Sequence, residues 1–174
     1  DEPCGDCGPG PHWIDGCHRG ADNVSSSALL GIAFNDDCLS AINLVMFGPA
    51  TVARSNPRDA SANYPALRPI DGHHDVIDTE MTSLQLTGGG ATLSAGRGLG
   101  AGGLLPPTFG AIAEQGGDPS QADSFFDVFV DVELPGGQHL FNHAPLRVRS
   151  VIDCIPPTTT YIHLIECIPM FDAP

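Results

Sequence analysis

Hydrophobic and polar residues alternate with a period of two in several parts of the chain, which is typical of β-strands with one buried face. The clearest example is 125–134 (FFDVFVDVEL), and residues 146–152 (LRVRSVI) alternate in the same way. Five apolar residues share one face of the first segment: Phe126, Val128, Val130, Val132 and Leu134. Helical periodicity is nearly absent, so we expect strands to build the fold.

Three further segments are predicted strands. Residues 27–34 (SALLGIAF) and 41–54 (AINLVMFGPATVAR) are apolar and prone to β-structure. The Gly-Pro pair at 48–49 is expected to split the second segment, because proline cannot donate a hydrogen bond to the ladder. In 76–87 (VIDTEMTSLQLT) the alternation changes parity midway, which predicts a β-bulge near Ser83.

Glycine and proline indicate where the chain turns. The glycines at 88–90 precede a short strand-like segment, and the Gly-Gly pair at 136–137 predicts a hairpin. Residues 55–74 and 96–122 are predicted loops, and a flat glycine-rich strand is the alternative for 96–103. Residues 118–124 (DPSQADS) are expected to form one short helical turn.

The last predicted pair of strands is 152–155 with 161–168, joined across a proline and threonine turn. Together these elements predict an all-β fold, a single β-sandwich or jelly-roll-like domain over residues 27–174. An irregular arm, rich in Cys, Gly and Pro and stapled by disulfides, is expected over residues 1–26.

Six cysteines lie toward the two ends of the chain, and an even number in this arrangement predicts three disulfides in an oxidising compartment. They are Cys4, Cys7, Cys17, Cys38, Cys154 and Cys167. We expect the last two to face each other across the C-terminal hairpin, whereas the pairing among the other four stays open. A zinc site built from the cysteines of the arm and His18 is the alternative.

The charge of the chain is strongly acidic. There are 21 acidic residues against 7 basic ones, all arginine, for a formal net charge of −14. Nucleic acids and anionic membrane surfaces both require a basic surface, so neither is an expected partner. No apolar run is long enough to cross a bilayer, so membrane insertion is not expected either. The composition suits a self-repelling surface or one that collects divalent cations.

The densest polar cluster is 71–80 (DGHHDVIDTE). Carboxylates at this spacing can converge on a hard cation, and calcium is the candidate cofactor. The predicted ligands are Asp71, Asp75, Asp78 and Glu80. A transition-metal site at His73 and His74 is one alternative, and a solvated loop edge without any metal is the other.

Acidic and aromatic residues alternate on the polar side of 125–134, and two arginines follow at 147 and 149. We predict a contact between subunits there, in which aromatic and acidic side chains of one copy meet arginines of another. The predicted contact residues are Phe125, Asp127, Phe129, Asp131, Arg147 and Arg149. The alternatives are an outward face made soluble by its acids and a glycosidase carboxylate pair.

Nothing in the sequence combines into a catalytic signature. There is no G-x-S-x-G elbow, and a phosphate-binding loop of the Walker type is impossible because the chain has no lysine. We therefore expect a protein that is not an enzyme. A secreted hydrolase that uses His73 and His74 is the alternative.

Residues 74–151 resemble uncharacterised secreted bacterial proteins of the PEP-CTERM-associated type. The likeness rests on DTEMTSLQLTG at 78–88, DSFFDVFVDVEL at 123–134 and PLRVRSV at 145–151. It implies export, a β-rich fold and a role at the cell surface or in a matrix. The Pro-Glu-Pro motif, hydrophobic helix and basic end of that sorting tail are missing, so release is expected in place of membrane-anchored sorting.

These observations predict a secreted structural protein, located outside the cell or at its surface after a signal peptide is removed. It would be a subunit of a filament, sheath or matrix, would polymerise with itself through strand edges and terminal arms, and would be stabilised by calcium. The alternative is a monomeric binding module for extracellular glycans or surface proteins. Asn23 begins an N-x-S glycan acceptor pattern.

Overall fold

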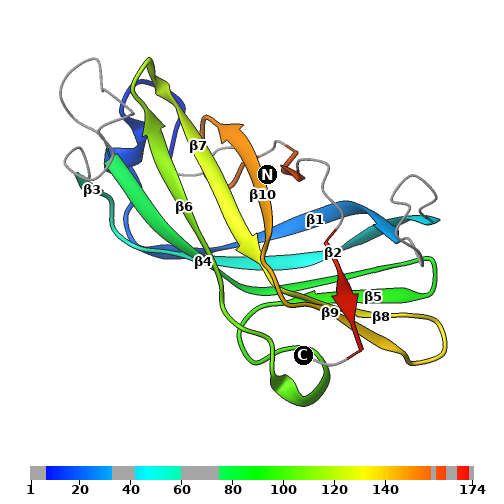
Figure 1. Ribbon diagram of the computed structural model, residues 1–174. Helices are drawn as coiled ribbons and strands as arrows, with labels where there is room; N and C mark the ends of the chain where they lie inside the picture. The colour runs from blue at the N-terminus through cyan, green and yellow to red at the C-terminus, as the bar shows by residue number, and fades with distance from the viewer. Residues whose placement is uncertain (1–6, 33–41, 60–74, 158–159, 164–167, 173–174) are drawn as a thin grey trace.

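The computed structural model describes residues 7–32, 42–59, 75–157, 160–163 and 168–172, and these residues form an all-β fold (Figure 1). The prediction of fold class is thereby confirmed. Every strand pair is antiparallel, and all pairs belong to one twelve-stranded sheet. Two short 3-10 helices, η1 (Trp13–Gly16) and η3 (Ala101–Gly103), are the helical elements of the described residues.

The strands divide into a long N-terminal pair and shorter strands that follow the central strand β4. They are β1 (Gly20–Ile32), β2 (Ile42–Arg54), β3 (Arg58–Asp59), β4 (Asp75–Gly88), β5 (Ala91–Ala95), β6 (Thr108–Gln115), β7 (Asp118–Val128), β8 (Val130–Glu133), β9 (His139–Asn142), β10 (Leu146–Ile152), β11 (Ile162–His163) and β12 (Met170–Phe171).

Strand β4 is where the sheet divides. It pairs with β3 and β2, and it also pairs with β6 through 76–81 and with β5 through 84–88. One branch then continues as β6-β7-β10-β11 and the other as β5-β8-β9-β12, and Figure 1 shows the two branches diverging. The register between β2 and β4 shifts between Thr51 and Val52, opposite 81–83, which confirms the bulge predicted near Ser83.

Two main hydrophobic clusters form the core. The smaller one packs η1 against the β4-β6-β7-β10 branch, with Trp13, Ile14 and Ile77 all buried. The larger one gathers apolar residues from β2, β4, β5, β7 and β8, including Met46, Leu86 and the inward side chains of 126–132. The described strands form one branched sheet, and the sandwich arrangement predicted from the sequence stays a prediction.

Three local predictions were wrong. Residues 118–124 form the start of β7 in place of a helical turn, and the predicted loop after 95 contains β6. The third wrong prediction is the split at 48–49, because β2 runs through the Gly-Pro pair without interruption. Glycine explains two of these errors, since a Cβ at Gly48 would lie 1.9 Å from the Gln85 carbonyl oxygen and one at Gly110 would lie 2.1 Å from that of Phe125. These glycines permit close strand approach.

The segment 125–134 is two strands, because the chain leaves one branch of the sheet for the other at Phe129. The buried Asn142 amide bridges this break. Its Oδ1 accepts a hydrogen bond from the Val130 N–H at 2.7 Å, and its Nδ2 donates to the Val128 carbonyl at 2.9 Å. The backbone groups at the break therefore keep partners although the ladder is interrupted.

Candidate functional site

Strands β1 and β2 form a ribbon that we name the β1–β2 ribbon. Its 13-residue register runs from the pair Gly20 and Arg54 to the pair Ile32 and Ile42. Within the described part of the chain, β1 pairs with β2 alone, so β1 is a long edge strand. Along an antiparallel pair, alternate residues of an edge strand direct their N–H and C=O groups away from the partner strand.

The outer face of the β1–β2 ribbon carries three large apolar side chains. Leu29 is 71% exposed, Val45 55% and Phe47 61%. Leu29 lies opposite Val45 across the ladder, and Phe47 lies two residues along from Val45 on the same face. Residues 23–32 and 42–53 contain no charged side chain. In a chain with net charge −14, this is a neutral surface with an apolar patch.

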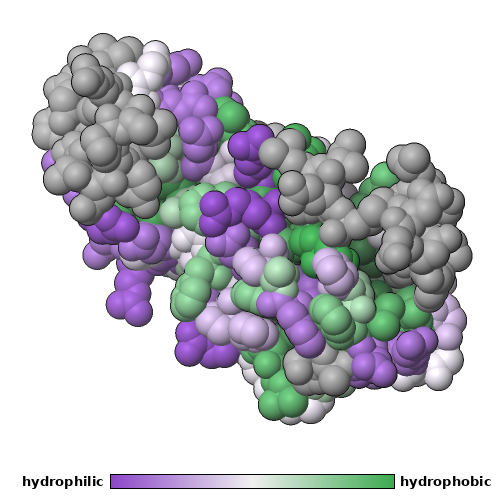
Figure 2. Space-filling view, in the orientation of Figure 1, coloured by the Kyte–Doolittle hydropathy of each residue, from purple (hydrophilic) through white to green (hydrophobic). Residues whose placement is uncertain are grey.

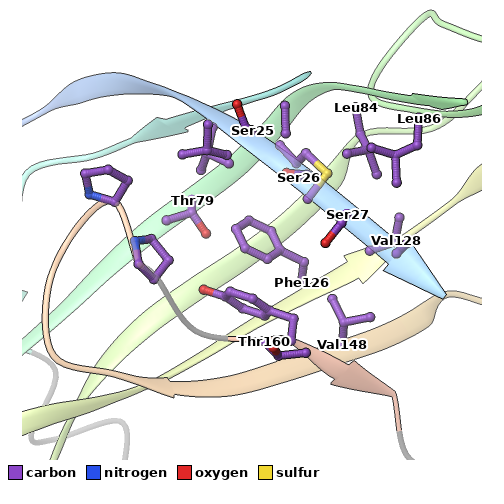
Figure 3. A pocket seen from close by; sticks show the side chains of 18 of the residues that line it. Ser25, Ser26, Ser27, Thr79, Leu84, Leu86, Phe126, Val128, Val148 and Thr160 are labelled. Carbon is purple, nitrogen blue, oxygen red and sulfur yellow. The ribbon is translucent and has the colours of Figure 1, made fainter. Parts of the chain in front are cut away.

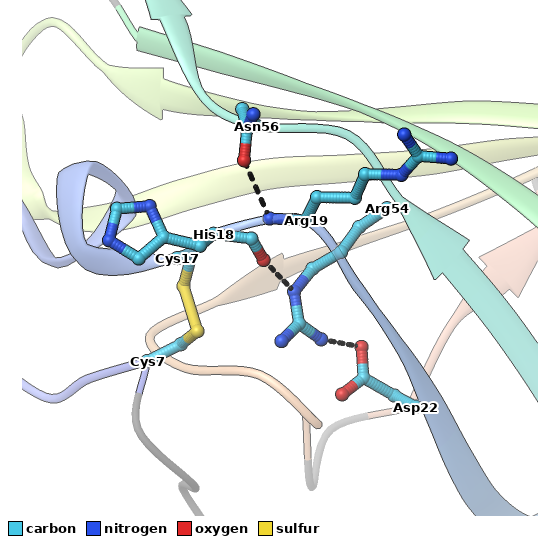
Figure 4. Close-up of polar contacts among 7 residues, drawn as sticks. All are labelled: Cys7, Cys17, His18, Arg19, Asp22, Arg54 and Asn56. Carbon is cyan, nitrogen blue, oxygen red and sulfur yellow. Dashed lines mark hydrogen bonds and ion pairs between the residues drawn. A yellow bond between two sulfur atoms is a disulfide. The ribbon is translucent and has the colours of Figure 1, made fainter.

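The base of the β1–β2 ribbon is tied to the N-terminal arm (Figure 4). Arg54 forms an ion pair with Asp22, and its Nε donates to the His18 carbonyl at 2.9 Å. The Arg19 N–H donates to Asn56 Oδ1 at 2.8 Å. These contacts hold the start of β1 and the end of β2 against the N-terminal arm.

A disulfide lies beside this base. Cys7 and Cys17 are bonded, with Cα atoms 5.0 Å apart, and both side chains are buried. Cys154 is also disulfide-bonded. Cys4, Cys38 and Cys167 lie outside the described residues, so the predicted pairing of Cys154 with Cys167 stays a prediction.

Three of the predicted subunit-contact residues, Phe125, Asp127 and Arg147, contact each other within one chain. Asp127 lies opposite Arg147 in the β7–β10 register, and its carboxylate accepts from the arginine Nε at 2.7 Å and Nη2 at 2.5 Å. The Arg147 guanidinium also lies 4.3 Å from the centre of the Phe125 ring. The hydrogen bonds to Asp127 raise the pKa of Arg147.

The other predicted contact residues are spread over different environments. Asp131 is 3% exposed, accepts from the Ala101 N–H at 2.6 Å and lies 2.9 Å from His139 Nδ1. The structure therefore does not place Asp131 on a contact surface. Phe129 is half-buried at the break between β7 and β8, and Arg149 is exposed opposite Phe125. A subunit contact through the remaining residues stays a prediction.

The predicted calcium ligands do not converge in the described part of the chain. Asp78 is paired with Arg58 at 2.9 Å, and Glu80 with Arg97 at 3.3 Å. No group of three or more His, Cys, Asp or Glu side chains among the described residues could hold a metal ion. Asp71, together with the alternative ligands His73 and His74, lies outside those residues, so the calcium site stays a prediction.

Asp75, the fourth predicted ligand, lies in a cluster of carboxylates at the start of β4. Burial, a hydrogen bond with the Asp15 carboxyl and the charges of Asp15, Glu114 and Asp59 raise the pKa of Asp75 to about 6. Glu114 is buried and forms an ion pair with His12 Nδ1 at 2.7 Å. In the view of Figure 2, hydrophilic residues lie beside this end of β6 and β7.

An apolar cavity of about 830 Å³ lies between the β1–β2 ribbon and the strands behind it (Figure 3). The described residues around it belong to β1, β2, β4, β5, β6, β7, β8 and β10 and to 155–157 and 160–162. Cavities with mostly apolar walls are typical of small-molecule binding sites.

Sequence reasoning missed both the β1–β2 ribbon as a site and the cavity. The available signal for the ribbon was the absence of charge from 23–32 and 42–53. No comparable signal marks the cavity, because its walls come from strands that are far apart in the sequence and are brought together by the branching of the sheet.

Comparisons with family models, curated proteins and solved structures found no match to this chain. The resemblance to PEP-CTERM-associated proteins stays a prediction. None of the helices in the described residues is long and apolar enough to traverse a membrane.

Proposed function

We propose that this protein is a non-enzymatic structural subunit of an extracellular assembly, in which the β1–β2 ribbon of one copy joins the next copy. The observation that carries the proposal is the 13-residue edge strand β1, whose ribbon presents Leu29, Val45 and Phe47 to solvent. Long edge strands with apolar neighbours are templates for pairing with another chain unless charge, proline or a cover blocks them.

The distribution of charge supports the same surface. A net charge of −14 opposes self-association of the chain as a whole. The outer face of the β1–β2 ribbon avoids that repulsion because 23–32 and 42–53 are uncharged. Burying side chains of the size of Leu, Val and Phe contributes roughly 1.5–3 kcal/mol each, and pairing of the β1 edge would add backbone hydrogen bonds.

The disulfides support an extracellular location for the assembly. Cys7 and Cys17 are bonded and Cys154 is bonded as well, and such bonds persist in oxidising compartments. We propose calcium as the cation that screens the repulsion between neighbouring copies, and this part of the proposal rests on the acidity of the chain alone.

Charge placed on the β1–β2 ribbon tests the proposal. Leu29→Glu and Phe47→Glu should abolish the fibres or sheets that the wild-type chain forms, as seen by negative-stain microscopy and light scattering. Leu104→Glu is the matched control, because Leu104 is 62% exposed in the loop before β6. Equal assembly by all four proteins, or uniform small particles of the wild-type chain, would contradict the proposal. Loss of assembly in EDTA would support the calcium component.

A further inference from the structure

We propose that the apolar cavity behind β1 binds an uncharged lipophilic small molecule. The cavity volume of about 830 Å³ lies in the range of small-molecule sites, roughly 300–1,000 Å³. The proposal goes beyond assembly, because it concerns the inner side of the β1–β2 ribbon and not its outer face.

The walls of the cavity are apolar. Figure 3 shows the side chains of β4, β7 and β10 that face β1 across it. The main apolar wall residues are Met81, Leu84, Leu86, Phe126, Val128 and Val148. Aromatic and aliphatic walls of this kind favour a lipophilic ligand over a sugar, which requires many hydrogen-bonding side chains.

Small side chains on β1 keep the cavity open. The even-numbered residues of β1 face inward, and at the middle of the strand these are Ser26 and Ala28. Leu30, the next inward residue, packs against the apolar cluster, as Ala28 does. A larger residue at 28 would therefore enter the cavity, which makes Ala28 the position at which the site can be filled by design.

The electrostatics exclude a charged ligand. Asp22 and Arg54 are the charged side chains at the cavity wall in the described residues, and they pair with each other. No cation is therefore left to hold a carboxylate there. The Tyr161 hydroxyl is already bonded to Ser124 Oγ at 2.7 Å, so the tyrosine presents its ring, 5.7 Å from that of Phe126, to the cavity.

The test uses the whole chain and the neutral fluorescent probe N-phenyl-1-naphthylamine at pH 7. We expect saturable binding of one probe per chain. Decan-1-ol should displace the probe at concentrations at least tenfold lower than decanoate.

Filling the cavity provides the control for specificity. Ala28→Phe from β1 and Val148→Phe from β10 should each abolish probe binding while the circular dichroism spectrum of the sheet is retained, and either variant suffices if the other does not fold. Absence of probe binding, or equal displacement by decan-1-ol and decanoate, would overturn the proposal. If the wild type does not bind the probe and the filled variants lose assembly, the cavity receives part of a second copy. That result would also overturn the proposal.

Discussion

Asp75 shows how the environment of one residue changes its chemistry. The sequence places it in an acidic run and predicts a calcium ligand, whereas in the fold it is 9% exposed and faces other carboxylates. These come from η1 (Asp15), β6 (Glu114) and β3 (Asp59), with His12 paired to Glu114. Burial and these charges favour the protonated acid, so the folded chain binds a proton there more tightly than the unfolded chain does.

This proton makes stability depend on pH. The pKa of Asp75 is about 6 in the folded chain, against the ordinary value of 3.8 for an aspartate. The stabilisation is therefore fully present below pH 3.8, and it is lost as the pH rises through 6. Each pKa unit is worth about 1.4 kcal/mol, so Asp75→Asn should raise the free energy of unfolding at pH 7 by on the order of 2–3 kcal/mol.

Thermal unfolding between pH 4 and 7 measures this effect. The melting temperature of the wild-type chain should fall relative to that of Asp75→Asn as the pH rises. Asp153→Asn, at an exposed aspartate, should follow the wild type throughout. Parallel curves for the wild type and Asp75→Asn would show that the carboxyl does not retain its proton in the folded state.

The elements that the sequence alone does not predict are those in which two strands approach each other closely. The alternation in 146–152 correctly predicted β10, whereas that in 125–134 continues across the break between β7 and β8, because both strands bury the same face. Residues 108–115 were predicted as loop because they contain Gly110 and follow a glycine-rich segment. In the sheet, that glycine lies against the backbone of β7, so its lack of a side chain is a packing requirement and not a sign of flexibility.

Gly110→Ala tests this packing requirement. The new Cβ would lie 2.1 Å from the Phe125 carbonyl oxygen, so β6 and β7 would have to separate. Overpacking of this kind costs typically about 1–3 kcal/mol, which chemical denaturation would detect. Gly117→Ala, in the turn between the same two strands, has no atom within 4 Å of the added Cβ and should change stability by less than about 0.5 kcal/mol. Equal effects of the two substitutions would argue against tight β6–β7 contact.

At the scale of the whole molecule, the acidity of the chain opposes association between copies, whereas the neutral β1–β2 ribbon favours it. The fold class and the oxidising compartment could be proposed from composition, alternation and cysteines. The sites could not, because the neutral ribbon and the cavity arise from pairing between residues distant in the sequence, such as Leu29 with Val45. The net charge of −14 acts between whole copies over about a Debye length, whereas the apolar patch acts only on contact.

Assembly should therefore depend on salt in a predictable direction. Raising sodium chloride from about 20 to 500 mM shortens the Debye length from roughly 20 Å to about 4 Å, so repulsion between acidic copies falls while burial of Leu29, Val45 and Phe47 is retained. Light scattering should detect assembly at lower protein concentration in the high salt. Phe47→Glu should remain unassembled at both concentrations, because its defect lies in the contact itself. Calcium chloride at matched ionic strength separates screening from binding: a larger effect than that of sodium chloride requires a site, and an equal effect means that calcium acts only by its charge.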